Sequence, residues 1–246
     1  MPRILTYNVH NGVGMDRRLD LDRIAQAIAL CRPDIVALQE LDVNRPRSGG
    51  VDQAHASAER LGMRFHFNAA IRVAEERYGD AILTALPMRL VKSGPLPTLP
   101  EYGMLEPRGA LWVEIEVGGR RLQVINTHFG LMPREQRAQA AELLSERWLA
   151  HPDCVDPVIL IGDFNATSGY RAYQSLKGAL RDAQKAVRSG FGRPTFPSRA
   201  PILRIDHAFV SPSVRVREVQ VADGALFRVA SDHLPLWMDF ELPDAV

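Results

Sequence analysis

The feature that most constrains this chain is a series of short apolar segments, each of which ends in a compact polar cluster. Five clusters end such segments and a sixth precedes the last one: Thr6-Tyr7-Asn8, Gln39-Glu40, Asn126-Thr127-His128, Gly162-Asp163-Phe164-Asn165, Ile205-Asp206-His207 and Ser231-Asp232-His233. Ionisable groups beside core strands are costly unless they pair, bind a metal or line a cleft. Catalytic groups also gather at strand ends in α/β sheets. The pattern therefore predicts one site built from the ends of several strands.

The pattern of apolar residues predicts alternating strands and helices along the whole chain. Expected strands are 4–7, 35–38, 81–85, 110–117, 122–126, 158–161, 205–210, 214–221 and 234–242. Expected helices are 19–30, 53–61, 134–150 and 170–178, and residues 188–204 are expected to form a long surface loop. Gly118-Gly119 is a two-residue hairpin signal. Without a linker or repeat, residues 1–246 are expected to form one α/β (α+β) domain.

Composition excludes several other classes of protein. With 246 residues, 46% of them hydrophobic, the chain can bury a core without disulfides or structural metal. The formal charge of +1 gives no global basic field for DNA binding. Cys31 and Cys154 form no CxxC pattern and are expected to be reduced thiols. The N-terminus lacks a signal-peptide pattern, and no apolar run approaches the roughly 20 residues of a membrane span. We therefore expect a cytoplasmic protein.

The clusters share one chemistry. Four carboxylates, two amides and two imidazoles stand in them: Glu40, Asp163, Asp206, Asp232, Asn8, Asn165, His128 and His233. Oxygen donors without cysteine suit Mg²⁺ or Mn²⁺ better than zinc. Such a metal polarises phosphoryl oxygens, and a neighbouring histidine can donate a proton. The chain has no G-x-S-x-G elbow, P-loop or G-x-G-x-x-G motif. Metal-assisted hydrolysis of a phosphoester is the chemistry that fits.

At these residues the chain resembles the endonuclease/exonuclease/phosphatase superfamily, which includes deoxyribonucleases, abasic-site endonucleases, neutral sphingomyelinases and inositol-polyphosphate 5-phosphatases. The matching strings, in the superfamily's order, are TYNVH, ALQELD, INTHFGL, GDFNA, IDHAFVS and SDHLPL. The resemblance implies a four-layer α-β-β-α sandwich of two mixed, mainly antiparallel sheets with helices outside. It also implies a metal at Glu40, with Asn8 and Asp232 close by.

The same resemblance implies the catalytic residues. Asp163 would orient or deprotonate the attacking water, and Asn165 would hold the phosphate or orient Asp163. His233, oriented by Asp206, would contact the phosphate, with His128 on its other side. Whether one or two metals act stays open.

Four further residues are candidates on weaker grounds. Tyr-Gly-Asp stands at 78–80 where many relatives carry Tyr-Gly-Asn. We expect Asp80 to hydrogen-bond His128; the alternative is that it caps a turn. Arg45, Arg47 and Arg108 are candidate phosphate ligands because guanidinium binds phosphate in a bidentate manner. Their alternative is an ordinary place in a solvated loop.

The substrate is a phosphodiester whose class stays open. We favour a small molecule or lipid headgroup, with a DNA or RNA endonuclease or exonuclease of repair type as the alternative and an inactive binding module as a third reading. No obligate protein partner is indicated. Residues 181–217 carry a local charge of +6, from eight basic and two acidic residues. We expect this stretch, including Arg188, Arg193 and Arg199, to rim the cleft.

Overall fold

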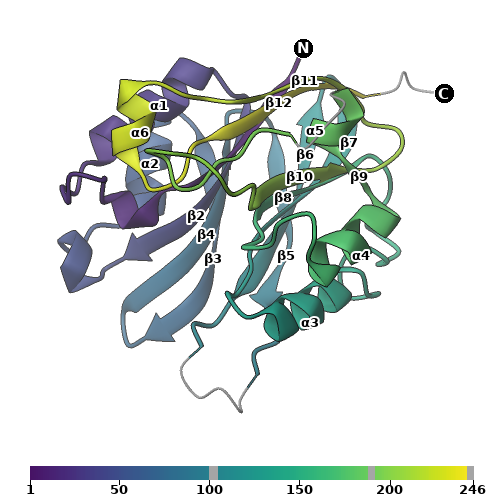
Figure 1. Cartoon of the computed structure of the whole chain (residues 1–246), viewed down its shortest axis with the longest axis horizontal. Helices are drawn as coiled ribbons and strands as arrows, with labels where there is room; N and C mark the ends of the chain where they lie inside the picture. The colour runs from purple at the N-terminus through teal and green to yellow at the C-terminus, as the bar shows by residue number, and fades with distance from the viewer. Residues whose placement is uncertain (100–104, 188–191, 243–246) are drawn as a thin grey trace.

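Two six-stranded sheets pack face to face in the computed structural model, which describes residues 1–99, 105–187 and 192–242 (Figure 1). The first sheet has the order β11-β12-β1-β2-β4-β3, and the second has the order β5-β6-β7-β8-β10-β9. The strands of the first sheet are β1 (Arg3–Asn8), β2 (Ile35–Val43), β3 (Arg64–Val73), β4 (Glu76–Thr84), β11 (Arg215–Val221) and β12 (Leu236–Glu241). Those of the second are β5 (Met88–Pro95), β6 (Gly109–Val117), β7 (Arg120–His128), β8 (Val158–Asp163), β9 (Arg181–Asp182) and β10 (Asp206–Val210).

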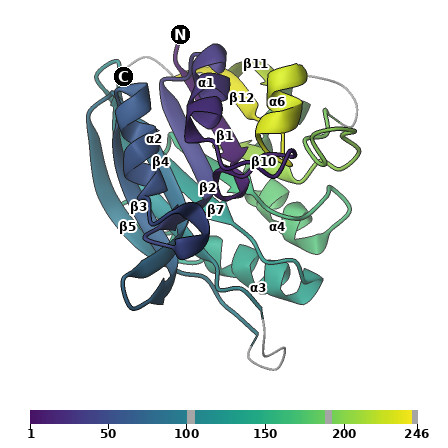
Figure 2. The same ribbon diagram turned by 90° about the vertical axis from the view of Figure 1, so that its left-hand side faces the viewer.

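Helices cover the outer face of each sheet (Figures 1 and 2). They are α1 (Leu21–Cys31), α2 (Gln53–Leu61), α3 (Pro133–Leu143), α4 (Arg171–Ala179), α5 (Ala183–Val187) and α6 (Ala225–Ala230), with short 3-10 turns at His10–Gly12 and Pro46–Ser48. Three apolar clusters fill the layers: one between the sheets, one under α1 and α2, and one under α3 and α4. The predicted four-layer sandwich is therefore confirmed.

Each sheet contains one parallel pair among antiparallel neighbours. β1 and β2 run parallel through the crossover helix α1, and β7 and β8 run parallel through α3. The carboxyl ends of a parallel pair lie at the same edge of a sheet. Because both pairs are central in their sheets, their ends meet across the sandwich, and this placement creates the site.

The sequence patterns located most elements but set some limits wrongly. The helix expected over 134–150 ends at Leu143, after which Ser145 and Trp148 form successive turns. Trp148 is fully buried and donates to Glu142 from its indole, so the chain turns to place it in the core. β3 and β5 were not predicted because their exposed faces interrupt the apolar pattern.

Two further expectations concern the loop regions. Gly118 and Gly119 form the predicted hairpin turn, both with positive φ. In the expected loop 188–204, residues 188–191 lie outside the described residues, and the rest is irregular apart from one bridge between Phe196 and Leu203. Among the described residues, no helix is long and apolar enough to cross a membrane.

Candidate active site

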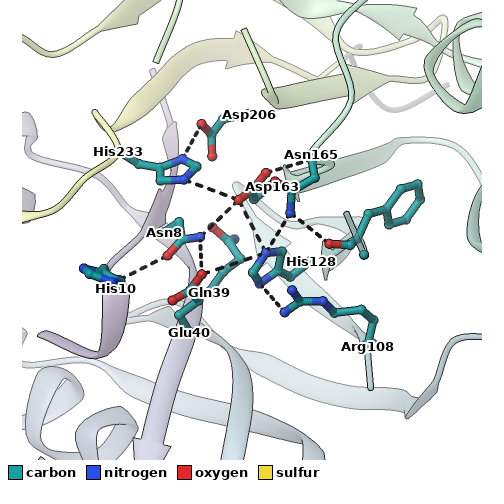
Figure 3. Close-up of polar contacts among 12 residues, drawn as sticks. Asn8, His10, Gln39, Glu40, Arg108, His128, Asp163, Asn165, Asp206 and His233 are labelled. Atoms are coloured by element: carbon teal, nitrogen blue, oxygen red, sulfur yellow. Dashed lines mark hydrogen bonds and ion pairs between the residues drawn. The ribbon is translucent and has the colours of Figure 1, made fainter. Parts of the chain in front are cut away.

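Strand register brings the polar clusters together at one edge of the sandwich. In the second sheet, His128, Asp163 and Asp206 are direct neighbours across β7, β8 and β10. In the first sheet, Asn8 of β1 is paired with Gln39 of β2. Figure 3 shows that these side chains, together with Glu40 and His233, point toward one another. The strand ends that were expected to build one site therefore meet at one edge of the sandwich.

A β-bulge aims Glu40 into the site. The register between β2 and β4 shifts between Leu38 and Leu41, and Glu40 itself has a φ of 62°. An extra residue in a strand bends it and redirects its side chains, and strained backbone of this kind is found at functional sites. Asp80, on β4 opposite the bulge, is buried and accepts a hydrogen bond from the Glu40 backbone. Burial raises the pKa of Asp80 to about 8, although the charge of Arg108 opposes that rise.

Asn8 joins the two halves of the site. Its Nδ2 donates to Glu40 Oε1 at 2.9 Å and to Asp163 Oδ2 at 3.0 Å, so one amide bridges the two sheets. Its Oδ1 accepts a hydrogen bond from the His10 backbone at 3.1 Å. That bond fixes which end of the amide faces the carboxylates. In this arrangement Asn8 orients two acids, and its role as a metal ligand stays a prediction.

Asp163 lies at the centre of the site and is 1% exposed. Oδ1 accepts from the Asn165 backbone at 2.9 Å, while Oδ2 accepts from Asn8. Burial raises the pKa of Asp163 to about 7, and the positive charge of His233 opposes the rise. A carboxylate with a pKa near neutrality can accept a proton from water, as a general base must.

His233 is paired with Asp206, as the resemblance implied. Its Nδ1 lies 2.9 Å from Asp206 Oδ2, and its Nε2 lies 3.6 Å from Asp163 Oδ2. Burial alone would lower the pKa of His233, but the charges of Asp206 and Asp163 outweigh burial and raise it to about 10. His233 is therefore a cation whose Nε2–H faces the site.

The loop 195–198 supports this pair, a role that sequence reasoning missed. The Thr195 hydroxyl donates to Asp206 Oδ2, and the Phe196 ring lies 4.9 Å from the His233 ring. Ser198 donates to the Asp232 backbone carbonyl from its own N–H. The string TFPS was a usable signal because it sets a hydroxyl, an aromatic ring and a second hydroxyl close to the IDH cluster in sequence.

The predicted bond between Asp80 and His128 is wrong. His128 Nδ1 lies 3.1 Å from Arg108 Nη1, and Nε2 lies 3.1 Å from Asn165 Nδ2. Both ring nitrogens are therefore engaged by other residues, while Asp80 supports the Glu40 bulge instead. Burial, then the charge of Arg108, lowers the pKa of His128 well below its ordinary value. The site thus pairs a cationic His233 with a neutral His128.

The cluster opens into a cavity of about 330 Å³. Its described lining is His10, Asn11, Glu40, Arg47, Tyr78, Glu106, Arg108, His128, Leu131, Asp163, Asn165, Phe196, Asp232 and His233. Of the predicted site residues, Asn8, Asp206 and Asp80 lie behind this surface and position those that reach it. His10, Asn11, Leu131 and Glu106 were not predicted as site residues, although His10 and Leu131 stand in the strings TYNVH and INTHFGL.

The arginines are arranged differently from expectation. Arg45 lies outside the cavity lining and pairs with Asp42 and Glu76 at 3.7 and 3.5 Å. Arg47 lines the cavity, and Asp42 holds it through two contacts of 2.7 and 2.8 Å. Arg108 is 7% exposed and donates to Glu106 at 2.6 Å as well as to His128.

The predicted arginine rim from residues 181–217 is not formed by its described arginines. That stretch contributes Phe196 to the described cavity lining, and no arginine. Arg199 donates to the Met15 carbonyl, and Arg193 lines a different cavity. Arg188 lies outside the described residues. Arg181 also donates to a backbone carbonyl and Arg204 pairs with Asp182, contacts that a charge count cannot detect.

Glu40 and Asp232 are the residues best suited to a cation. Burial raises the pKa of Glu40, the hydrogen bond from Asn8 opposes the rise, and the charge of Asp232 adds to it. Burial is the main cause of the rise, so the pKa does not identify a cation, but the two carboxylates offer the hard oxygen donors that suit Mg²⁺ or Mn²⁺. A second group, Asp163, Asp206 and His233, has ligand atoms within 4.8 Å of one another. Because Asp206 already binds His233 and Thr195, we interpret that group as a hydrogen-bonded network.

Three known proteins resemble this chain in sequence or in fold. The uncharacterised protein YbhP of Escherichia coli (strain K12) is 27% identical over 98% of this chain and 96% of its own. An endonuclease/exonuclease/phosphatase from Beutenbergia cavernae superposes with a TM-score of 0.79 and 25% identity, over 98% of this chain and 71% of that one. A mannosyl-6-phosphatase from Bacteroides thetaiotaomicron has the same fold, with a TM-score of 0.77 and 22% identity over 98% and 100% of the two chains.

A family model also matches most of the chain. The model of the Endonuclease/Exonuclease/phosphatase family matches residues 5–233, a span that contains every strand end described above. The resemblance drawn from the six sequence strings is thereby confirmed, and the fold and the family agree. This chain belongs to the endonuclease/exonuclease/phosphatase family, whose members are hydrolases of phosphoesters.

Proposed function

We propose that this protein is a divalent-metal-dependent phosphoesterase that hydrolyses a small-molecule or lipid phosphodiester by attack of water. One observation carries the proposal: a buried base, Asp163, and a cationic His233 face the same cavity as the acids Glu40 and Asp232. A binding module without catalysis would have no need for a base and a cation around one phosphate-sized space.

The chain's own residues have distinct tasks in this reaction. Asp163, held by Asn8 and Asn165, accepts a proton from the attacking water. His233 donates a hydrogen bond from Nε2 to a phosphate oxygen, while Asp206 holds its ring. Glu40 and Asp232, with Asn8 beside them, would hold Mg²⁺ or Mn²⁺, which supplies charge stabilisation on the phosphoryl and leaving oxygens.

The shape of the cavity supports a small substrate. A volume of about 330 Å³ accommodates a phosphate and a small headgroup. Leu131 and Phe196 give the cavity apolar surface, while Arg47 and Glu106 offer polar contacts. Among solved structures of this fold, one is named a mannosyl-6-phosphatase.

The test is a hydrolysis panel with Mg²⁺, Mn²⁺ or EDTA. It compares a chromogenic diester, a monoester, plain and abasic DNA, RNA and phospholipids. We expect the diester or a phospholipid to be cleaved with metal, and neither with EDTA. Glu40→Ala and His233→Ala should each abolish cleavage. Wild type that is indistinguishable from both variants on every substrate would exclude an enzyme and favour a binding module.

A nuclease is the second candidate, and one observation favours it. A separate cavity of about 320 Å³ is lined by Arg134, Arg137 and Arg171. It includes Pro133, two residues from Leu131 in the catalytic cavity, so an anionic strand could pass over both. DNA cleavage that falls steeply with salt would favour the nuclease, provided that an Arg137→Gln/Arg171→Gln variant cleaves DNA more weakly and with a shallower salt dependence. Arg89→Gln, on another face, is the control.

We also propose a cytoplasmic location. Cys31 and Cys154 are both free thiols, as expected in a reducing compartment. Fractionation of cells that produce the untagged protein tests this, and recovery with the periplasmic or secreted fraction would contradict it.

A further inference from the structure

We infer that Arg108 is a positioning residue that fixes the tautomer of His128, so that the imidazole presents Nε2–H to the phosphate. The inference rests on the proposed function for its catalytic consequence, but the tautomer itself can be measured without any substrate. It replaces the expectation that Arg108 is a phosphate ligand.

Two donors compete for one acceptor on this ring. Arg108 Nη1 approaches Nδ1 at 3.1 Å, and Asn165 Nδ2 approaches Nε2 at 3.1 Å. A neutral imidazole has one N–H and one lone pair, so it can accept from only one of them. Turning the Asn165 amide around would not resolve the conflict, because the same Nδ2 donates to the Phe129 carbonyl at 2.9 Å.

The energies of the two contacts decide the competition. A guanidinium has five N–H donors and no acceptor, and it stays charged in proteins. A hydrogen bond from a charged donor is roughly twice as strong as one between two neutral groups. With Arg108 7% exposed, water cannot readily replace a lost acceptor. A proton on Nδ1 would face that buried cation, so the proton belongs on Nε2.

The opposite end of the ring agrees with this assignment. Nε2 lies 3.5 Å from Asp163 Oδ2 and 4.0 Å from Glu40 Oε1, two carboxylate oxygens at the cavity. Both oxygens attract an N–H on Nε2 and would repel a lone pair there. Arg108 is held in its place by Glu106, which accepts from the same Nη1 at 2.6 Å. Thus Glu106 holds Arg108, and Arg108 holds the His128 ring with its Nε2–H toward the cavity.

The first measurement is the tautomer in the wild-type protein. ¹⁵N shifts of the imidazole nitrogens separate a protonated from an unprotonated nitrogen, and the His128 signals are assigned by their loss in His128→Gln. We expect the proton on Nε2. A proton on Nδ1 would overturn the inference whether or not the protein has activity. If the proton is on Nε2 but no substrate is hydrolysed, the proposed function fails and the tautomer assignment stands.

The second measurement uses three variants. Arg108→Met removes the donor, so the proton should move to Nδ1 and Nε2 should accept from Asn165. We then expect kcat to fall about 100-fold, the effect of losing one preorganised donor, with little change in KM. Arg108→Lys restores a donor and should restore Nε2–H and most of kcat. Arg89→Met removes an arginine that pairs with Glu114 on another face and should change neither.

The variants separate positioning from substrate binding. If Arg108→Met raises KM, leaves kcat near wild type and keeps the proton on Nε2, Arg108 binds the phosphate directly and the inference is wrong. A loss of kcat without a tautomer change would also overturn it. Thermal unfolding shows whether each variant is folded. If Arg108→Met is unfolded, the tautomer and kcat of Arg108→Lys decide whether the inference holds.

Discussion

Thr195 lies outside the cavity, but we expect it to affect the proposed reaction through Asp206. Its hydroxyl is fully buried and donates to the Asp206 oxygen that also binds His233. We predict that Thr195→Val, a change of nearly equal volume, lowers kcat about tenfold and leaves KM nearly unchanged. The reason is that Asp206 loses one of two donors and no longer fixes the His233 ring. Steady-state kinetics on the best substrate of the panel measures both constants.

Thr84→Val is the matched control for this prediction. Thr84 is equally buried and donates to the Asp34 carbonyl, but it lies at the end of β4, four residues beyond Asp80, and outside the cavity lining. Both variants should lose about 1–2 kcal/mol of unfolding free energy, while only Thr195→Val should lose activity. Equal kinetics in the two variants would show that Thr195 serves stability alone.

Glu40 should limit stability while it enables metal binding. Its carboxyl is largely buried beside Asp232. We predict that Glu40→Gln raises the Tm in EDTA, because it removes the repulsion between the Glu40 and Asp232 carboxylates. Saturating Mg²⁺ at about 100 Kd should stabilise wild type by about 2.7 kcal/mol and leave the variant unchanged. Thermal unfolding with and without Mg²⁺ tests both, and a variant that Mg²⁺ stabilises as much as wild type would place the metal elsewhere.

At the scale of elements, β8 depends on a glycine next to Asp163, its proposed general base. Gly162 has a φ of 148°, and a Cβ there would lie 1.9 Å from the Thr127 carbonyl oxygen of β7. We predict that Gly162→Ala destabilises the protein by about 3 kcal/mol and displaces Asp163. Gly118→Ala is the control: its φ is 58°, but no atom lies within 4 Å, so about 1 kcal/mol is expected. Urea unfolding compares them, and equal losses would contradict the steric argument.

The next strand, β10, carries a buried histidine that makes stability depend on pH. Burial lowers the pKa of His207 from 6.5 to about 4, and its Nε2 lies 2.7 Å from the Ala166 carbonyl. Between these values the unfolded chain binds a proton that the folded chain does not. Stability therefore falls as pH falls from 6.5 to 4, by up to about 3 kcal/mol, and the loss stays constant below pH 4.

His207→Gln should flatten this pH dependence. Glutamine can still donate to the Ala166 carbonyl, but it does not titrate. Urea unfolding at pH 7 and at pH 4.5 gives the change in unfolding free energy for each protein. We expect the change in wild type to exceed that in the variant by about 2–3 kcal/mol. The same change in both proteins would mean that His207 is protonated in the folded state.

At the scale of the whole molecule, the sequence predicted which residues meet but not how they are held. The strand-end clusters were visible because buried strands and polar ends differ sharply in local composition. The bulge at Glu40, the bond from Arg108 to His128 and the loop beneath His233 were not visible. Each depends on contacts between segments distant in sequence, and several donors could satisfy the same acceptor. Only the packed structure selects among them.

Asn126 shows how the two sheets are held in register behind the site. The bulge in β2 interrupts its pairing with β4, and Asn126 of the opposite sheet donates to Leu38 and Ala81 carbonyls there, both at 2.9 Å. Its Oδ1 accepts from Gln39 at 2.7 Å. This side chain therefore replaces the hydrogen bonds that the bulge disrupts, and it connects the half-site that carries Glu40 to the half-site that carries Asp163.

We predict that Asn126→Leu abolishes activity before it unfolds the protein. Two buried carbonyls and one amide lose a partner, at a cost of about 3 kcal/mol or more. Ile115→Ala, at the far end of the same interface, should cost about 2–5 kcal/mol by leaving a cavity. Activity at a temperature where circular dichroism shows both variants folded separates the effects. Ile115→Ala should keep its kcat, because the cavity that it leaves lies away from the strand ends. Asn126→Leu should lose its activity, because Glu40 and Asp163 no longer face each other across the bridge formed by Asn8. An Asn126→Leu variant with wild-type kcat would mean that packing alone aligns the two sheets.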